Sequence, residues 1–400
     1  MPQLSRVLDR FRPSPIAHIF ALAIQLKEEG RDIVNLAAGE PDFETHDSVC
    51  AAAHAAIDQG ETKYTAVDGA NHLKRAIQEK FKRDNGLDYD LDEIVVDGGA
   101  KPVLGHIMRA LLDPGDEVII PTPCWTSHPG MVQLCSADPV FVPGPEDRGF
   151  KLRPEDLEAA ITEKTKALIL CSPSNPTGAV YDPQELRALT DVLLRHEDVW
   201  IVADDIYEKL VYDGREFATP ARVEPRLRDR IITVNGVSKG YSMTGWRIGF
   251  AGGPRQAMAG VKKVMSQATG CASSISQVAA AAALTGPQEY ISQRTAIFQE
   301  RRDLVVRALN QAEGLKVRPC EGAFFLYINC GDVLGKKTPA GALLESSADF
   351  ARYLLEEKGV ALIPGAAFEY DPYVRLSFAA STEALEDACT RIRNACAALL

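Results

Sequence analysis

The sequence predicts an α/β protein whose larger part is built on a mostly parallel sheet flanked by helices. From about residue 86 onward, strand-like and helix-like segments alternate, which is typical of parallel strands joined by helical crossovers. The strand-like runs are almost continuously apolar, as expected of strands that are covered on both faces. After about residue 286 a long charged helix and further strand-like runs replace this alternation. This change indicates a smaller α+β part.

The individual elements follow from periodicity and from start and stop signals. Helices are expected at about 15–30, 47–59, 70–85, 102–112, 288–312, 346–358 and 382–398. Strands are expected at 33–36, 94–96, 118–120, 167–170, 200–203, 231–234, 323–327, 360–363 and 373–378. Gly30 suits the end of the first helix, and Pro102 suits the first turn of the fourth. We therefore expect a large domain over 47–287 and a small domain formed by 1–46 together with 288–400.

The composition describes an acidic globular chain. Its 400 residues are 46% hydrophobic and 25% charged, with a formal net charge of −11, and this balance disfavours nucleic acid and anionic membranes as partners. The nine cysteines are scattered without a Cys-x-x-Cys motif, and the seven histidines lack metal-ligand spacing. Neither a disulfide framework nor a metal site is predicted. No signal-like apolar core opens the chain, so the cytoplasm is the expected location.

The stretch Ser238–Phe250 (SKGYSMTGWRIGF) directs attention to a reactive amine. It follows the strand expected at 231–234, so Lys239 should lie beyond that strand's carboxyl end, where open α/β sheets bind ligands. A desolvated lysine can form a Schiff base with a carbonyl compound, and Arg247 offers a planar fork of donors suited to a phosphate. A phosphorylated aldehyde such as pyridoxal 5'-phosphate fits both residues. Taken alone, however, an exposed lysine and arginine are more often solvated surface.

A second candidate site is the turn Gly98-Gly99-Ala100-Lys101-Pro102, between a predicted strand and a predicted helix. Small residues there let the backbone N–H groups of Gly99 and Ala100 reach an anion at the positive end of the helix. A plain strand-to-helix turn is the alternative. The chain contains neither a Gly-x-Gly-x-x-Gly fingerprint nor a P-loop, so dinucleotide and nucleoside-triphosphate binding are disfavoured.

Five more candidate residues lie near strand ends or within a strand. Asp204 and Tyr207 follow an apolar strand; they could contact a pyridine nitrogen and a ring oxygen, or Asp204 could simply cap a helix. Asn175 lies between two prolines that fix an irregular loop. Trp125 could stack on an aromatic cofactor or belong to the core. Arg375, in an alternating strand, needs an anionic partner, either a substrate carboxylate or a structural salt bridge.

Together these segments resemble the class I aminotransferases of PLP fold type I, the aspartate aminotransferase family. The motifs are Ser172–Gly178 (SPSNPTG), Asp204–Tyr207 (DDIY) and Ser238–Gly249, in that order. The resemblance spans nearly the whole chain, from Leu36–Phe43 (LAAGEPDF) to Val374–Ser377 (VRLS). It implies the family's fold, pyridoxal 5'-phosphate as cofactor, and a homodimer with shared active sites.

The resemblance also implies a role for each matching residue. Lys239 binds the cofactor covalently and shuttles a proton, Asp204 keeps the ring nitrogen protonated, and Tyr207 contacts the ring oxygen. The implied cofactor-binding residues are Gly99, Ala100, Lys101, Trp125, Asn175, Asp204, Tyr207, Ser238, Lys239, Arg247 and, from a second subunit, Tyr64. The implied substrate-binding residues are Gly39, Trp125, Asn175, Arg375, Lys101 and Ser14, with Arg375 holding the α-carboxylate. Ser238 is expected to replace a phosphate ligand that some relatives carry where this chain has Gly236.

The implied reaction is a ping-pong exchange of an α-amino group between an amino acid and a 2-keto acid. Lys101 and Ser14 match a branch that uses acidic donors, so aspartate is favoured, or glutamate. Ile16, Cys124, His128 and Gly130 depart from that branch and are expected near the substrate mouth. The acceptor therefore stays open among 2-oxoglutarate, glyoxylate and oxaloacetate.

Three rival functions stay open on the sequence alone. The first is an aminotransferase for aromatic or neutral amino acids. The second is another fold-type I enzyme, such as a carbon–sulfur lyase or a decarboxylase. The third is a PLP-binding regulator without turnover, which is disfavoured because this acidic chain leaves no room for a DNA-binding module outside the fold.

Overall fold

The computed structural model describes residues 3–11 and 15–400. Its strands are β1 (Val34–Asn35), β2 (Ile94–Asp97), β3 (Glu117–Thr122), β4 (Asp138–Pro143), β5 (Thr165–Cys171), β6 (Trp200–Asp204), β7 (Ile231–Gly236), β8 (Gly249–Gly252), β9 (Phe325–Asn329), β10 (Val360–Ala361), β11 (Ile363–Pro364) and β12 (Tyr373–Ser377). Its α-helices are α1 (Pro15–Glu28), α2 (Asp47–Asp58), α3 (Asn71–Lys80), α4 (Ala100–Leu111), α5 (Ser127–Leu134), α6 (Pro154–Ala160), α7 (Pro183–Leu193), α8 (Pro220–Val223), α9 (Arg255–Ala268), α10 (Ser274–Thr285), α11 (Glu289–Leu309), α12 (Ser347–Lys358) and α13 (Thr382–Ala397).

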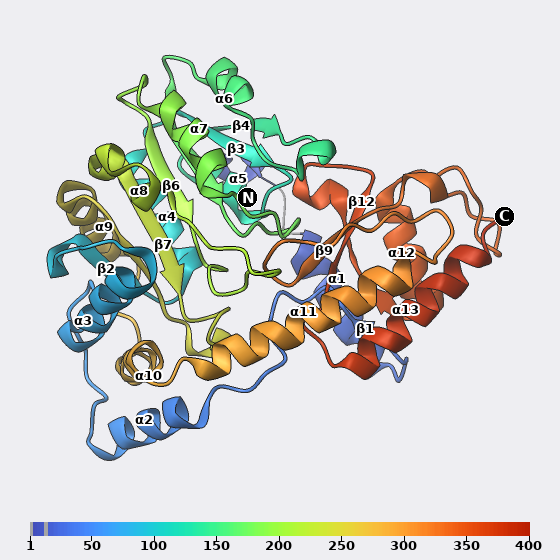
Figure 1. Cartoon of the computed structure of the whole chain (residues 1–400), viewed down its shortest axis with the longest axis horizontal. Helices are drawn as coiled ribbons and strands as arrows, with labels where there is room; N and C mark the ends of the chain where they lie inside the picture. The colour runs from blue at the N-terminus through green and yellow to red at the C-terminus, as the bar shows by residue number, and fades with distance from the viewer. Residues whose placement is uncertain (1–2, 12–14) are drawn as a thin grey trace.

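The central sheet confirms the predicted architecture (Figure 1). Its strand order is β2-β8-β7-β6-β5-β3-β4. All neighbours run parallel except β8, which is antiparallel to both β2 and β7. Because β8 lies between them, β2 and β7 point the same way. The carboxyl ends of β2, β3, β5, β6 and β7 therefore share one edge of the sheet.

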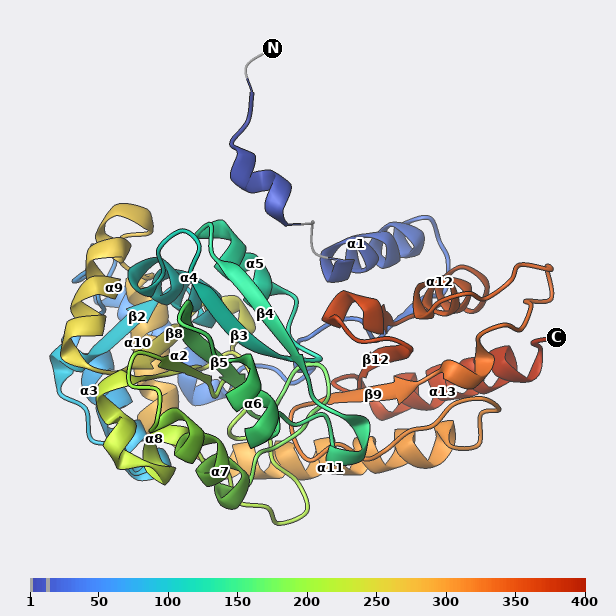
Figure 2. The same ribbon diagram turned by 90° about the horizontal axis from the view of Figure 1, so that it is seen from above.

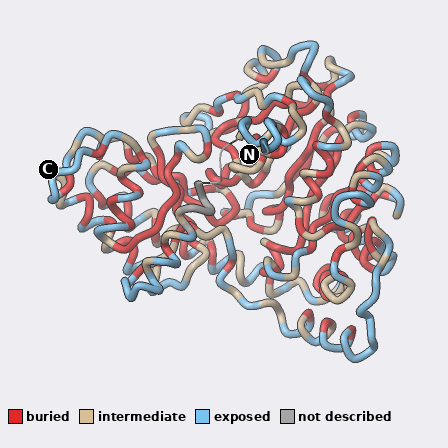
Figure 3. Tube along the Cα trace, turned by 180° about the vertical axis from the view of Figure 1, so that it is seen from behind, coloured by how far each residue is buried: buried red, intermediate tan, exposed pale blue. Residues whose placement is uncertain are grey.

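Helices cover both faces of this sheet, which explains the apolar strand sequences. Successive side chains of a strand point to opposite faces. Val118 and Ile120 of β3 pack in a cluster with residues of α4, α5 and α9, whereas Ile119 packs on the opposite face with residues of α2, α3, α7 and α10. The tube in Figure 3 is accordingly buried along most of the sheet.

Two strands of the sheet were not predicted, for different physical reasons. β4 begins Asp138-Pro139 and ends at Pro143, and proline lacks the N–H that a central strand needs. As an edge strand, β4 pairs only with β3. β8 is rich in glycine because its neighbours lie too close for a side chain. A Cβ on Gly249 would lie 2.1 Å from the Ala100 nitrogen, and one on Gly252 would lie 2.5 Å from the Tyr89 ring.

The carboxyl-terminal part is organised around a three-stranded antiparallel sheet of order β11-β12-β9. The amino-terminal segment joins it, because β1 pairs in parallel with β10, and α11 runs from the side of the central sheet to this part (Figures 1 and 2). Its core contains Leu36, Phe298, Phe324, Phe350 and Leu376. The domain boundaries at 46/47 and 287/288 stay a prediction. Within the described residues, no helix combines the length and apolar character needed to cross a membrane.

Candidate active site

A cavity of about 230 Å³ lies at the carboxyl edge of the central sheet. It is lined by Gly39, Ala100, Lys101, Leu104, Trp125, Cys171, Asn175, Asp204, Ile206, Tyr207, Ser238, Lys239, Arg247 and Arg375. Eleven of these were proposed from the sequence as site residues. Leu104, Cys171 and Ile206 were not.

The sheet topology brings these side chains together from distant parts of the sequence. Loops after the carboxyl ends of β3, β5 and β7 carry Trp125, Asn175 and Lys239, and Asp204 is the last residue of β6. β8 runs the opposite way, so Arg247, two residues before its start, reaches the same edge. Ligand sites form at this edge because loops leave the strands there while the sheet stays rigid.

Lys239 presents its amine to this cavity. Its Nζ donates a 2.7 Å hydrogen bond to the carbonyl oxygen of Gly39. Burial, together with the nearby cations Arg247 and Arg375, lowers the pKa of Lys239 to about 8, although Glu40 opposes the shift. On the order of a tenth of the amine is therefore neutral, and so nucleophilic, at about pH 7, far more than for an ordinary lysine.

Asp204 is buried, and only one of its two carboxylate oxygens has a hydrogen-bond partner. Its Oδ2 lies 3.2 Å from Nε2 of the buried His128, whereas its Oδ1 has no hydrogen-bond partner. The rings of His128 and Trp125 also lie at 90° to each other, with 5.3 Å between their centroids. The expectation that His128 lies near the substrate mouth is therefore wrong, because this residue is buried against Asp204. The 76-residue separation hides this pair from sequence reasoning.

Arg375 connects the two parts of the molecule. It lies on β12, the middle strand of the small sheet, and is only 1% exposed. Its Nη1 donates to Asn175 Oδ1 at 3.0 Å and its Nη2 donates to the Ala37 carbonyl at 2.6 Å. Its Nε has no partner, and burial lowers its pKa to about 10. In the described structure no carboxylate forms an ion pair with this guanidinium, which leaves it able to bind an anion.

The turn before α4 leaves an open space at Gly99, because this residue has no side chain. Gly99 adopts φ +113°, and a Cβ placed there would lie 2.4 Å from Arg247 Nη2. Asp97 fixes the turn by accepting from the Gly98 nitrogen at 2.6 Å and from Thr269 Oγ1 at 3.0 Å. Lys101, in the first turn of α4, has its pKa lowered by burial and by Arg247. Backbone N–H groups at a helix start, together with a guanidinium, suit a phosphate.

Four features of the site thus fit a phosphorylated, nitrogen-containing aromatic aldehyde. A partly neutral amine can bind the aldehyde carbon, and the unpartnered Asp204 Oδ1 can accept from a protonated ring nitrogen. The space at Gly99 beside Arg247 exists only because glycine has no side chain. The buried Tyr207 keeps its proton, because burial raises the pKa of its hydroxyl, and it can therefore donate to a ring oxygen. Pyridoxal 5'-phosphate has all the groups that these features require.

Several residues predicted from the sequence lie elsewhere or are not described. Tyr64 is 97% exposed and does not line this cavity, and Ser14 lies outside the described residues. Cys124 is buried behind the cavity, and its nitrogen donates to the Phe368 carbonyl. A Cβ on Gly236 would lie 3.0 Å from the Ile206 side chain, whereas Ser238 does line the cavity.

Of the three lining residues that were missed, Leu104 lies on a predicted helix, Cys171 ends a predicted strand, and Ile206 lies in the turn after β6. Leu104 is four residues after Ala100 on α4, so helical spacing could have indicated that both lie on one face. Cys171 ends β5, and Ile206 lies between Asp204 and Tyr207 in the sequence. Their apolar side chains carry no chemical signal of their own. Their position beside the predicted polar residues is the only indication that the sequence offers.

Comparison with known proteins agrees with this geometry. The family model described as aminotransferase class I and II matches residues 31–392. The chain is 54% identical to an aspartate aminotransferase of Rhizobium meliloti (strain 1021) over 383 residues, which cover 96% of this chain and 93% of that protein. It is 51% identical over 399 residues to an aspartate/prephenate aminotransferase of Cereibacter sphaeroides, with both chains fully covered.

Solved structures show the same likeness. The crystal structure of the aspartate aminotransferase from Rhizobium meliloti superposes with a TM-score of 0.97 at 52% identity, covering all of both chains. The aspartate aminotransferase from Thermus thermophilus with maleate superposes with a TM-score of 0.92 at 39% identity, covering 99% of this chain and all of that one.

Proposed function

Because the chain belongs to the class I and II aminotransferase family, as its motifs predicted, we propose that it binds pyridoxal 5'-phosphate at Lys239. With this cofactor it transfers the α-amino group of an acidic amino acid, preferably aspartate or else glutamate, to a 2-keto acid. One observation carries the proposal. The same cavity holds a lysine amine with a pKa near 8, a carboxylate oxygen of Asp204 without a partner, and a buried arginine without a counter-ion.

When bound, pyridoxal 5'-phosphate supplies an aldehyde that accepts the amino group and a ring that holds the electron pair released from the substrate's α-carbon. Arg375 and Asn175 hold the α-carboxylate, which fixes the α-carbon beside Lys239. Lys239 Nζ, when neutral, removes the α-proton and later returns one. Asp204 Oδ1 accepts from the ring nitrogen, and His128 holds the other oxygen of that carboxylate. The protein thus orients the substrate, moves one proton and stabilises one charge.

Lys101 is the residue that we propose for the distal carboxylate of an acidic donor. It lines the cavity, and its Nζ lies 5.4 Å from the centre of the Trp125 ring. The names of the relatives support this donor class, because two similar proteins are called aspartate aminotransferases. The structure of one of them was obtained with maleate, which is itself a dicarboxylate. The acceptor stays open among 2-oxoglutarate, glyoxylate and oxaloacetate.

Prephenate is a fourth candidate acceptor, and the names of several relatives support it. Several relatives that cover the whole chain at 47–51% identity are called aspartate/prephenate aminotransferases, some of them only as probable. Prephenate also carries two carboxylates, so Arg375 and Lys101 could bind it as they would bind a dicarboxylic amino acid. We therefore include prephenate among the candidate acceptors.

A matrix of amino donors against keto acceptors tests the proposal. Aspartate, glutamate, phenylalanine and alanine are combined with 2-oxoglutarate, glyoxylate, oxaloacetate and prephenate, and the products are identified by mass spectrometry. We expect aspartate to give oxaloacetate in a 1:1 ratio with the new amino acid. Release of ammonia or carbon dioxide in place of a second amino acid would instead indicate a lyase or a decarboxylase. Binding of pyridoxal 5'-phosphate without turnover of any pair would indicate a regulator.

We further propose a homodimer in which Tyr64 of one subunit reaches the phosphate site of the other. In support, Tyr64 is almost fully exposed and lies outside the cavity of its own chain. Mixed dimers of Lys239→Ala and Tyr64→Ala chains test this arrangement. If Tyr64 acts across the interface, each mixed dimer contains one intact site with the cofactor affinity of the wild type. If Tyr64 acts within its own chain, the mixed dimers contain no intact site. A protein that is active while it sediments as a monomer would also contradict the arrangement.

The location and the division into domains are also proposals. All nine cysteines are unpaired in the structure, which agrees with the reducing cytoplasm that the sequence favours. The strand pairing of β1 with β10 supports a small domain made of 1–46 and 288–400. Limited proteolysis with mass mapping would test the boundaries, because linkers between domains are cleaved first.

A further inference from the structure

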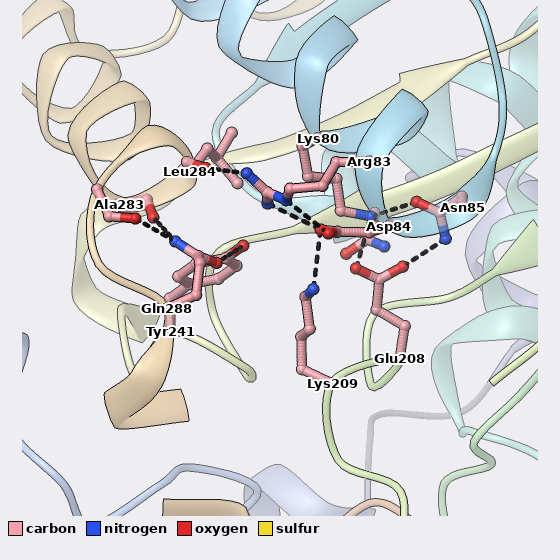
Figure 4. Close-up of polar contacts among 12 residues, drawn as sticks. Lys80, Arg83, Asp84, Asn85, Glu208, Lys209, Tyr241, Ala283, Leu284 and Gln288 are labelled. Carbon is pink, nitrogen blue, oxygen red and sulfur yellow. Dashed lines mark hydrogen bonds and ion pairs between the residues drawn. The ribbon is translucent and has the colours of Figure 1, made fainter. Parts of the chain in front are cut away.

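Lys80, Asn85 and Glu208 form a closed triangle of buried polar side chains (Figure 4). Lys80 Nζ lies 2.5 Å from Glu208 Oε1 and donates to Asn85 Oδ1 at 2.7 Å. Asn85 Nδ2 closes the triangle by donating to Glu208 Oε2 at 2.7 Å. The three residues are 1%, 1% and 7% exposed. None of them lines the cavity.

The triangle joins two elements that have no sequence proximity. Lys80 ends α3, and Asn85 ends the single wide turn Phe81–Asn85, which has the i to i+5 pattern of a π-helix. Such turns are rare, and they occur often at functional sites. Glu208 directly follows Tyr207 in the turn after β6, the strand that ends at Asp204. The wide turn therefore holds the segment that carries Tyr207, next to the strand end that carries Asp204.

A second layer of contacts extends the connection to the Lys239 loop. Lys209 Nζ lies 2.8 Å from Asp84 Oδ2, and Asp84 in turn accepts from Arg83 at 2.7 and 2.9 Å. The stem of Lys209 packs directly against Gly240, where an added Cβ would lie 2.8 Å from Lys209 Cβ. Gly240 is the neighbour of Lys239. The same wide turn thus contacts the Tyr207 loop through the triangle and reaches the Lys239 loop through Asp84 and Lys209.

We propose that Lys80, Asn85 and Glu208 are positioning residues, which set the distance of Tyr207 and Lys239 from the bound cofactor. The inference rests on the proposed function, because it concerns contacts to pyridoxal 5'-phosphate. A buried ion pair is seldom the most stable way to fill a core, since well-packed apolar side chains often serve equally well. The hydrogen bonds of the triangle, however, fix one relative placement of the wide turn and the loop, which apolar packing would not.

The test separates positioning from stability with an apolar replacement of the whole triangle. The triple variant Lys80→Met, Asn85→Leu and Glu208→Met removes all three polar groups together, so no charge is left unpaired. Its urea midpoint in the cofactor-free state is expected to stay close to that of the wild type. Two readouts follow in the loaded protein: the pH midpoint of the absorption spectrum of the bound cofactor, and kcat and KM measured separately.

We expect the pH midpoint of the triple variant to shift by about 0.5 unit or more, because the contacts around the cofactor change. We also expect kcat to fall roughly tenfold, because a small misplacement of a catalytic group is costly, while KM for the amino acid stays within about twofold, because Arg375 is untouched. A triple variant with the midpoint and kcat of the wild type overturns the proposal. Should this variant fail to fold, Asn85→Ala, which keeps the ion pair, must show the same two changes in smaller measure.

Arg302→Met is the matched control. Arg302 is equally buried and bonded to Asp213 at 2.7 and 2.9 Å, but on α11 and away from the cavity. It should lower the urea midpoint and leave the spectrum and kcat unchanged. An equal spectral shift in this control would contradict the proposal. If the wild type itself binds no pyridoxal 5'-phosphate, the proposed function fails; if it binds and the triangle variants match it, only this inference fails.

Discussion

Lys80 is fully buried and Lys239 is half-buried in the same half of the molecule, and their surroundings differ. Burial lowers the pKa of each ammonium. Lys80 is saturated by Glu208 at 2.5 Å and Asn85 at 2.7 Å. Lys239 donates to one backbone carbonyl, that of Gly39, and within the described residues it has no carboxylate in ion-pair contact. One lysine is therefore held in an ion pair, and the other is a partly neutral amine that faces a cavity.

Burial alone therefore does not make a lysine reactive. Its protonation also depends on the neighbouring groups, because a carboxylate in contact favours the charged form, whereas neighbouring cations and desolvation favour the neutral form. Lys239 has Arg247 and Arg375 nearby, and both lower its pKa. Groups whose pKa is shifted without a satisfied partner mark sites of chemistry, and saturated groups mark structure.

The largest expected effect is the loss of amino transfer in Lys239→Ala. Because this variant lacks both the covalent anchor and the proton carrier, turnover should fall by a factor on the order of 10⁴ or more, with the fold retained. Turnover at saturating substrates and the circular dichroism spectrum check this. The control is Lys263→Ala on the exposed face of α9, which should behave as the wild type. Turnover within tenfold of the wild type in Lys239→Ala would remove the distinction between the two lysines.

The next-largest expected effect is on stability, and here the change at Lys80 should cost more than the change at Lys239. Lys80→Met leaves the buried Glu208 without its cation, and this should lower the free energy of unfolding by about 3–5 kcal/mol. Lys239→Met should leave the cofactor-free protein as stable as the wild type or more so, because a desolvated amine is removed from an active site. Urea unfolding of the cofactor-free proteins at pH 7 measures both. Equal destabilisation by the two changes would show that Lys239 is as well satisfied as Lys80.

A third prediction extends the comparison to two buried arginines. Arg302 is saturated by Asp213 and the Cys320 carbonyl, whereas Arg375 keeps an unpartnered Nε. Because a lysine cannot reproduce the planar fork, Arg375→Lys should lower kcat/KM for aspartate roughly 10- to 100-fold. Arg302→Lys should change the thermal midpoint instead and leave kcat/KM unaltered. Steady-state kinetics measure kcat/KM for both variants. Equal losses of kcat/KM in the two would refute the role of Arg375 in binding the substrate.

The smallest effect is a dependence on pH. Since only the neutral amine attacks an aldehyde, capture of pyridoxal 5'-phosphate by the cofactor-free protein should follow the Lys239 pKa of about 8. The rate should rise roughly fivefold from about pH 7 to pH 8 and level off above about pH 9, well below the usual lysine pKa of about 10.4. Stopped-flow absorbance measures this. A rate that keeps rising to about pH 10 would mean that the amine is not perturbed.

The sequence predicted much of the fold, because most of its signals are local. The apolar strands β3, β5, β6 and β7 and most of the longer helices were predicted within a few residues. The helices α7, α9 and α10 were not predicted, and two strands of the central sheet were missed because a tertiary feature overrides a local rule. Prolines hid β4, which lies at the edge of the sheet, and glycines hid β8, whose neighbours leave no space for side chains.

The chemical groups of the site were predictable from the sequence: the amine of Lys239, the carboxylate of Asp204, and the guanidinium groups of Arg247 and Arg375. Such groups are recognisable one at a time, because each belongs to a short motif. Which of them have hydrogen-bond partners depends on the tertiary structure. His128 meets Asp204 across 76 residues, and Asn85 meets Glu208 across 123. Contacts of this kind depend on strand order and helix packing, which involve the whole chain and which no local pattern contains.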